Sequence, residues 1–232
     1  MPDLTFAINS AEPIRFAAVP TLGFRLEVSQ AAGGEPIENV LLQAQIQIDA
    51  PRRRYAPDEQ AGLRDLFGDV GSWSRTLRTM HWTHAQVLVP AFEDRVAVDL
   101  AVPCTFDFNV AATKYFHALE AGEVPLTFLF SGTVFYRDHE GGLQATRIPW
   151  SKEAQFRLPV AVWRLMMDAY YPNTAWLCLH RDAFEKLAAF KRARGIPTWE
   201  QALEELLARD AEGAVDAASA TASGAGQREG GP

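Results

Sequence analysis

The chain has 232 residues, of which 48% are apolar and 11% aromatic, so it can bury a substantial core without disulfides or structural metals. Its net charge of -7 argues against a general nucleic-acid-binding protein. Two cysteines are too few for a disulfide framework or a zinc cluster. With no signal peptide and no apolar stretch of about 20 residues, we expect a cytoplasmic protein without a membrane span.

The first fifty residues predict several β-strands. Apolar and polar residues alternate over residues 4–8, and the same period returns within residues 14–28, where Pro20 and Gly23 interrupt it. These segments predict two or three short strands. Residues 40–48 predict a half-buried strand, because apolar side chains on one face alternate with three glutamines on the other.

A stretch rich in charged and turn-forming residues follows. Pro57 suits the first turn of a helix, and a helical spacing that includes Leu63 and Leu66 ends near Gly68. We therefore expect residues 51–80 to form an insertion or crossover that leaves the sheet.

Further strands are predicted in the middle of the chain. Their alternating patterns cover residues 83–89, 95–100 and 104–110. Helical spacing then covers residues 111–121, and Gly122 ends it. A short helix of this kind commonly links two strands of a sandwich.

Residues 124–136 have the clearest pattern of a central strand. Large apolar side chains occupy one face, and the other face is mixed, so we expect it to be buried on one side and half buried on the other. Gly132 suggests a bulge, and the glycines at 140–142 predict a turn into a partner strand over residues 143–156.

The last third of the chain is predicted to be helical. Pro159 starts a helix that Pro172 stops. Capping patterns that begin at Asp182 and Thr198 predict two more helices. Residues 210–232 have no large apolar period, so we expect a disordered tail.

Together these patterns predict a mainly β fold. We expect an immunoglobulin-like antiparallel β-sandwich of about seven strands, with short helical insertions and C-terminal α-helices. Residues 1–158 would form the sandwich, including the helical insertion at about 51–80. Residues 159–209 would form a C-terminal helical segment packed on the sandwich, and residues 210–232 the tail.

The reactive side chains form no recognisable catalytic motif. His81 and His84 would face opposite sides of a regular strand, so no metal site is expected. Cys104 and Cys178 are predicted to be small buried thiols. The basic run Arg52–Arg54 is typical of a solvated loop, although it could also dock an acidic partner. We therefore expect no catalytic residue, cofactor or metal ion, with a cryptic hydrolase or metal enzyme using Cys104 or the two histidines as an open alternative.

Aromatic residues are concentrated near the start of the C-terminal helical segment. Core packing and helix docking explain most of the six tryptophans. A smaller group lies close together in sequence, and exposed aromatic clusters are rare without a partner. The candidate residues for binding a protein partner are Trp163, Tyr170, Tyr171 and Trp176.

Five segments of the sequence carry a resemblance to a known family. They are ValProCysThrPheAspPheAsnValAlaAlaThrLysTyrPhe, ProLeuThrPheLeuPheSerGlyThrValPheTyr, LeuProValAlaValTrp, TyrTyrProAsnThrAlaTrpLeu and ProThrTrpGluGlnAlaLeu. Over residues 3–208 the chain resembles a family of uncharacterised bacterial, actinobacterial-type proteins associated with gene clusters for uptake nickel-iron hydrogenases. The resemblance implies an accessory role and supplies no catalytic residues.

A weaker likeness is to the export chaperone SecB, in which a four-stranded antiparallel sheet precedes a helix and a Phe-Pro segment leads to a final helix. TyrTyrPro leads here to the helix at Asp182 in a similar way, whereas the insertion at 51–123 departs from that pattern. This likeness implies an alternative SecB-like α+β fold.

We hypothesise a non-enzymatic accessory or protein-binding module that acts in hydrogenase maturation or assembly. Its partner would be a hydrogenase component or a maturation factor, and no nucleic acid is expected. The alternatives are a SecB-like chaperone for unfolded peptides and the cryptic enzyme.

Overall fold

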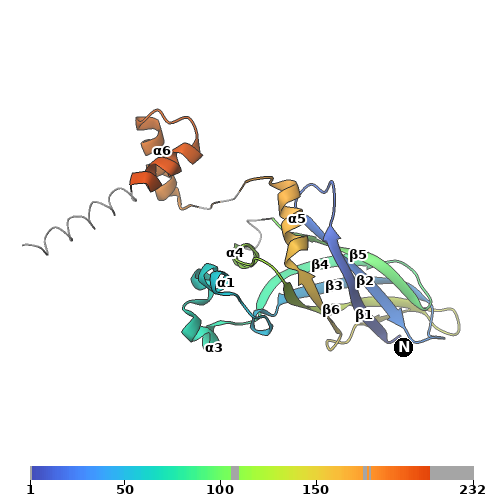
Figure 1. Cartoon of the computed structure of the whole chain (residues 1–232). Coiled ribbons are helices and arrows are strands. Elements are labelled where there is room, and N and C mark those ends of the chain that lie inside the picture. The colour runs from blue at the N-terminus through green and yellow to red at the C-terminus, as the bar shows by residue number, and fades with distance from the viewer. Residues whose placement is uncertain (1, 106–109, 175–176, 178, 210–232) are drawn as a thin grey trace, which may run out of the picture. The chain divides into compact units, whose positions relative to one another are not determined.

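The computed structural model describes residues 2–105, 110–174, 177 and 179–209. Its first compact unit, Met1–Ala175, is built on two antiparallel sheets (Figure 1). The smaller sheet has the order β1-β2-β5, from strands Leu4–Pro13, Thr21–Gln30 and Arg95–Pro103. The larger has the order β4-β3-β6-β7, with β8 also paired to β6; its strands are Met80–Val89 (β4), Ile37–Ile48 (β3), Glu123–Arg137 (β6), Leu143–Arg147 (β7) and Glu153–Pro159 (β8). The expected mainly β, sandwich-like fold is confirmed.

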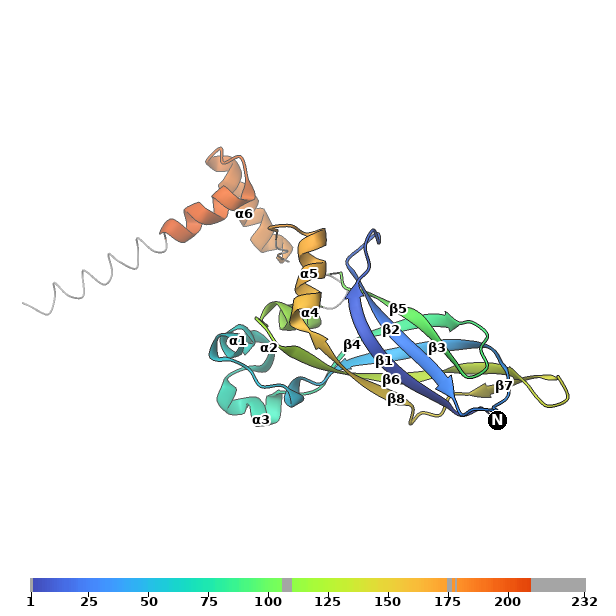
Figure 2. The ribbon, with the colours of Figure 1, turned by 45° about the vertical axis from the view of Figure 1, so that its right-hand side comes forward.

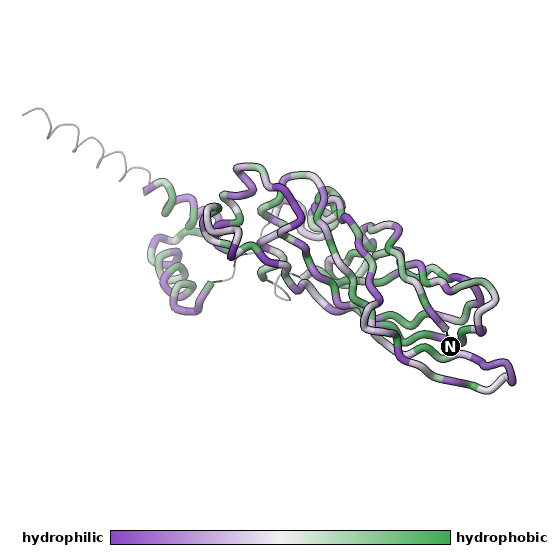
Figure 3. The backbone as a smooth tube through the Cα atoms, turned by 90° about the horizontal axis from the view of Figure 1, so that it is seen from below, coloured by the Kyte–Doolittle hydropathy of each residue, from purple (hydrophilic) through white to green (hydrophobic). Residues whose placement is uncertain are grey.

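The core lies between the two sheets, where alternate residues of each strand are buried. Along β3 the buried side chains alternate with the three predicted glutamines, and Figure 3 shows the same alternation of apolar and polar residues along the strands. Phe24 of β2 contacts the rings of Trp82 and Phe128 edge-on, at 6.3 and 5.1 Å between centroids. Phe6 stacks on Phe130 at 4.4 Å, so aromatic contacts join both sheets.

The predicted insertion is an extended connection between two paired strands. Ile48 at the end of β3 pairs with Met80 at the start of β4. Between them lie short helical segments, with Gly68 at a φ of 72° ending the second α-helix as expected. They are η1 (Ala50–Arg52), α1 (Pro57–Gly62), α2 (Arg64–Phe67), η2 (Val70–Ser72) and α3 (Trp73–Thr76).

The partner of β6 differs from its prediction. Residues 143–156 were expected to form one strand, but they form β7 and the beginning of β8, which pair with successive parts of β6. Pro149 has no N–H to donate to the ladder, and the chain loops out over residues 148–152 before Phe130 N donates to Lys152 O at 2.9 Å.

Gly132 was predicted to mark a bulge, but its pairing with β3 is regular. A Cβ at this position would lie 2.0 Å from the carbonyl oxygen of Leu41, and φ is 146°. The backbones of β3 and β6 approach too closely here for any residue with a Cβ, so this position requires glycine.

The strand predicted at 104–110 is also wrong within the described residues. β5 ends at Pro103, and Val110 already begins α4 (Val110–His117). Phe106 and Phe108, on which the alternation depended, lie outside the described residues. The helix ends four residues earlier than predicted, and the irregular turn that follows includes Gly122 at a φ of 80°.

α5 (Val160–Tyr170) begins directly after Pro159, as predicted, and packs on the sandwich. Its side chains at Trp163, Met166 and Met167 are buried with those of the sheets. The boundary between the two compact units therefore falls after Ala175, and not at residue 158.

The second unit, Trp176–Pro232, contains α6 (Arg181–Ala193) and a helix over residues 199–209. The predicted cap of Asp182 with Glu185 is wrong, because α6 begins at Arg181 and no side chain caps it. The second cap is confirmed, since Gln201 N donates to Thr198 Oγ1 at 3.2 Å. The predictions for Trp176, Cys178 and residues 210–232 fall outside the described residues. No helix among the described residues is long and apolar enough to cross a membrane.

Candidate protein-binding groove

A groove lies between α5 and the loop that joins β1 to β2. Both ribbon views place α5 beside the end of β1 and this loop (Figures 1 and 2). The groove has a volume of about 670 Å³. Its lining is mostly apolar and includes Pro13, Arg15, Phe16, Val162, Leu165 and Tyr170.

The loop over residues 14–20 is fixed by one hydrogen bond at the base of the hairpin and by others from α5. Ile14 N donates to Thr21 O at 2.9 Å, which closes the hairpin. The Tyr170 hydroxyl lies 3.1 Å from Ile14 O and 3.0 Å from Ala17 O, where it donates to the loop. The last turn of α5 therefore holds the hairpin loop in position.

α5 is amphipathic, and this explains the other wall of the groove. The same helix that buries Trp163 and Met166 leaves Leu165 62% exposed. Arg164 donates to the carbonyl oxygen of Leu119 at 2.6 Å and so ties the helix to the turn after α4. The exposed apolar face of α5 is thus held at two points, by Arg164 and by Tyr170.

Phe16 is the most unusual residue of the groove. Its side chain is 100% exposed, and its φ is 62°. A residue with a Cβ loses roughly 1–2 kcal/mol in the left-handed region. Leaving a phenylalanine in water forgoes about 1.5–3 kcal/mol of burial energy. Both properties are unfavourable in the isolated chain, which marks the loop as a functional candidate.

Of the three predicted partner-binding residues that the structure describes, one lies in this groove. Tyr170 lines it, whereas Tyr171 is half buried and packs against the core. Trp163 is 3% exposed and stacks on Phe116 at 5.2 Å, so it is inaccessible to a partner. The prediction for Trp163 rested on aromatic content, which does not show which face of a helix is buried.

Sequence reasoning missed the residues that carry the exposed apolar surface. Phe16 stands between Pro13 and Pro20, and this bracketing by prolines was a signal for a loop in place of a continuous strand. Val162 and Leu165 are three apart, which puts them on one side of a helix. That spacing could have identified the second wall of the groove.

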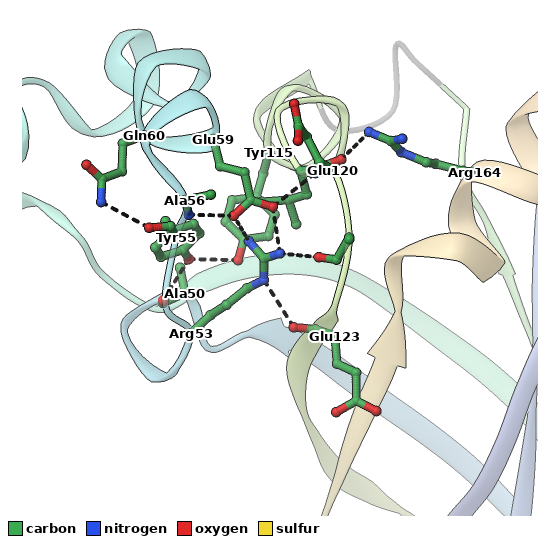
Figure 4. Close-up of polar contacts among 12 residues, drawn as sticks. Ala50, Arg53, Tyr55, Ala56, Glu59, Gln60, Tyr115, Glu120, Glu123 and Arg164 are labelled. Atoms are coloured by element: carbon green, nitrogen blue, oxygen red, sulfur yellow. Dashed lines mark hydrogen bonds and ion pairs between the residues drawn. The ribbon is translucent and has the colours of Figure 1, made fainter.

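A second distinctive region joins the insertion to the turn before β6 (Figure 4). Arg53 donates to both carboxylate oxygens of Glu59, at 3.0 and 2.8 Å, and these side chains are 7% and 5% exposed. Glu59 also accepts from Ala56 N and Glu120 N. Arg53 was predicted to lie in a solvated loop; this is wrong, because a carboxylate six residues later draws it into the protein.

The charges of this cluster set the pKa of Glu59. Burial alone would raise the pKa of this carboxyl group, but the Arg53 guanidinium and the N–H groups of Glu120 and Ala56 outweigh burial and hold the pKa below its ordinary value. Arg53 also donates to the carbonyl oxygens of Ala121 and Glu123. Both charged groups are thus saturated with partners.

Two tyrosines complete this region. The Tyr55 hydroxyl donates to Ala50 O at 2.7 Å and lies 2.8 Å from the Tyr115 hydroxyl. Burial raises the pKa of both phenols, so they stay protonated near neutral pH. We interpret the cluster of Arg53, Glu59, Tyr55 and Tyr115, hereafter the buried polar cluster, as an anchor for the insertion.

Cys104 does not have the properties of a nucleophile. The thiol is buried and donates to Val102 O at 3.3 Å. Burial raises the pKa of Cys104 to about 12, so the reactive thiolate is scarce at neutral pH.

The two histidines of β4 lie differently from their prediction. A bulge at Trp82 puts His81 and His84 on the same face, with their ring centres 4.6 Å apart. Among the described residues, no three His, Cys, Asp or Glu side chains are grouped as metal ligands.

Comparisons with solved structures give only distant likenesses. A putative ApaA protein from Bordetella pertussis is 12% identical, with 68% of this chain and 93% of that chain covered and a TM-score of 0.27. AggA, the major subunit of aggregative adherence fimbriae type I from Escherichia coli, is 10% identical, with coverages of 68% and 95% and a TM-score of 0.24. A β-glucosidase from Kluyveromyces marxianus is 8% identical, with coverages of 68% and 15% and a TM-score of 0.22.

No curated protein matches the sequence. A family model described as a family of unknown function, DUF6084, matches residues 1–215. The chain is therefore a member of the DUF6084 family.

Proposed function

We propose that this protein is a non-enzymatic accessory module that binds a protein partner through the groove between α5 and the hairpin loop. The observation that carries the proposal is the exposed Phe16 in a left-handed conformation beside an apolar groove. A partner that covers Phe16 and Leu165 would remove both side chains from water. The free energy gained by that burial would offset the free-energy cost of keeping Phe16 exposed in the unbound protein.

The groove favours an apolar segment of a folded or extended protein chain as its ligand. Val162, Leu165 and Pro13 supply its apolar surface. Glu12 and Arg15 line the same groove and can pair with polar groups that flank the apolar segment. An apolar centre with charged residues beside it is the usual composition of a protein interface.

The resemblance noted from the sequence suggests which partners to test first. It is to proteins associated with uptake nickel-iron hydrogenase gene clusters, so we propose a hydrogenase component or a maturation factor as the partner. Accessory binding in assembly requires no catalytic group of this chain.

Site-specific photo-crosslinking in the native cell tests the proposal directly. A photoreactive amino acid replaces Phe16 in one variant and Trp150 in the other; the wild-type side chains are 100% and 92% exposed. We expect position 16 to give a discrete adduct that contains a hydrogenase component or maturation factor, and position 150 to give none. Absence of an adduct at position 16 under conditions where the partner is present would exclude the groove as its site.

A matched pair of leucine variants provides the second test. Leu165→Ser lies in the groove and Leu143→Ser lies on β7, and both wild-type side chains are 62% exposed. We expect only Leu165→Ser to reduce co-purification of the partner. If the protein instead slows aggregation of many unrelated unfolded chains through Phe16, the SecB-like chaperone function is supported.

A further inference from the structure

A pair of imidazole side chains lies on β4, away from the groove, and it supports an inference that is independent of the proposed function. The strand pairs Ile46 with Thr83 and then Gln47 with His81, so Trp82 is one extra residue of β4 in the register with β3. This is a β-bulge, which rotates one residue out of the normal alternation.

Burial along the strand follows this bulge. Trp82 and Thr83 are consecutive, yet both are buried, at 4% and 3% exposed. His81 on one side of them and His84 on the other are both exposed. Two residues three apart, which face opposite sides in a regular strand, here lie on the same exposed face.

The separation of the two rings suits a shared ligand. Their centroids are 4.6 Å apart, with an angle of 50° between the ring planes. Two imidazoles bound to the same metal ion, with metal–nitrogen distances of about 2.0–2.1 Å, have ring centres roughly 4.5–5.5 Å apart.

We propose that His81 and His84 together bind one divalent first-row transition metal ion at the protein surface. Neutral imidazole is a common ligand for such ions, and the affinity order places Cu²⁺ above Ni²⁺ and Zn²⁺. Gln45 and Gln47 of β3 stand opposite His84 and His81 in the sheet. Water or these amide groups would complete the coordination.

Titration of the full-length protein with Cu²⁺ alone tests the site, with affinity measured by calorimetry and nitrogen ligation by electron paramagnetic resonance. We expect one equivalent of Cu²⁺ with two imidazole nitrogens. His81→Asn and His84→Asn should each weaken that equivalent by about 10²-fold, since the second imidazole no longer acts at high effective concentration. The double variant, which keeps neither imidazole, should lose this equivalent altogether.

His139→Asn is the matched control, because His139 is also exposed but lies on the β6–β7 turn. It should keep the affinity and the spectrum of the wild type. Circular dichroism and thermal unfolding of each variant check that the fold is retained. The proposal is overturned if only one of the two β4 histidines matters, if two ions bind with one nitrogen each, or if His139→Asn has the same effect.

Discussion

The buried polar cluster and the groove beside α5 have opposite relations between polarity and exposure. Arg53 and Glu59 are charged and buried, whereas Phe16 and Leu165 are apolar and exposed. The charged pair has all its hydrogen-bonding partners within the protein. The apolar pair is in contact with solvent. A conspicuous charged cluster can therefore be purely structural, and the less polar surface is where a partner is expected.

The largest effect should come from breaking the charged pair. Replacing Glu59 with Leu leaves the Arg53 guanidinium buried without its carboxylate, and we expect a loss of about 3–5 kcal/mol in the free energy of unfolding. Urea denaturation measures this loss. Asp99→Leu is the control, because the Arg25–Asp99 pair is 47% and 65% exposed and should contribute about 0–1 kcal/mol.

If the cluster is an anchor, the double variant Arg53→Met/Glu59→Leu should recover part of the stability lost in Glu59→Leu. Removing both charges leaves no unpaired ion in the interior. A double variant that is less stable by the full sum of the two single losses would contradict this account of the pair.

A second effect concerns acid. The pKa of Glu59 is lowered in the folded state from an ordinary value of 4.5, so its contribution to stability is complete above that value. The contribution is lost as the pH falls through the folded-state pKa. We expect Glu59→Gln to flatten the decline of stability below about pH 4.5, measured by urea denaturation across the acid range. An unchanged decline would show that other carboxyl groups dominate acid unfolding.

A smaller effect is expected at the contact between α5 and the loop. Tyr170→Phe removes the hydroxyl that donates to Ile14 O and Ala17 O, and should cost about 1 kcal/mol. Hydrogen exchange should become faster in residues 14–20 and stay unchanged in β3. Tyr136→Phe, in a half-buried tyrosine of β6, is the control. Equal exchange in the loop of wild type and Tyr170→Phe would show that the hydroxyl does not fix it.

The smallest effect should separate stability from binding. Phe16→Asn introduces a residue that adopts the left-handed region more readily than phenylalanine does. We therefore expect the free energy of unfolding to rise by about 0.5–1 kcal/mol. Partner capture should fall at the same time. Trp150→Asn, which replaces another exposed aromatic residue, should leave partner capture unchanged. It should change the free energy of unfolding by no more than about 0.5 kcal/mol. A loss of stability in Phe16→Asn would mean that Phe16 has a structural role.

Local periodicity predicted much of the sandwich because the strands are buried on one face. The alternation around the glutamines of β3 and the start of α5 after Pro159 both agree with the structure. The bulge at Trp82 was harder to see, since it changes the face of only a few residues. It becomes evident in the structure, where two consecutive residues between His81 and His84 are buried.

The positions that depend on distant partners could not be read from local patterns. Arg53 is buried because it donates hydrogen bonds to Glu59 and to the carbonyl oxygen of Ala121. The second of these partners lies 68 residues away in the sequence. Trp163 is buried because Phe116 stacks on it from another helix. Charge runs and aromatic content describe side chains, whereas burial depends on which surfaces the fold brings together.

The hydrogen bonds of Tyr170 also bear on how the chain folds. They join residues separated by 156 and 153 positions, so the first hairpin meets its final neighbour only after nearly all of the first unit has been synthesised. β1 and β2 can pair early, because their contacts are local. During translation, however, the loop that carries Phe16 must wait for α5, which makes the locking of this loop a late event in the folding of a nascent chain.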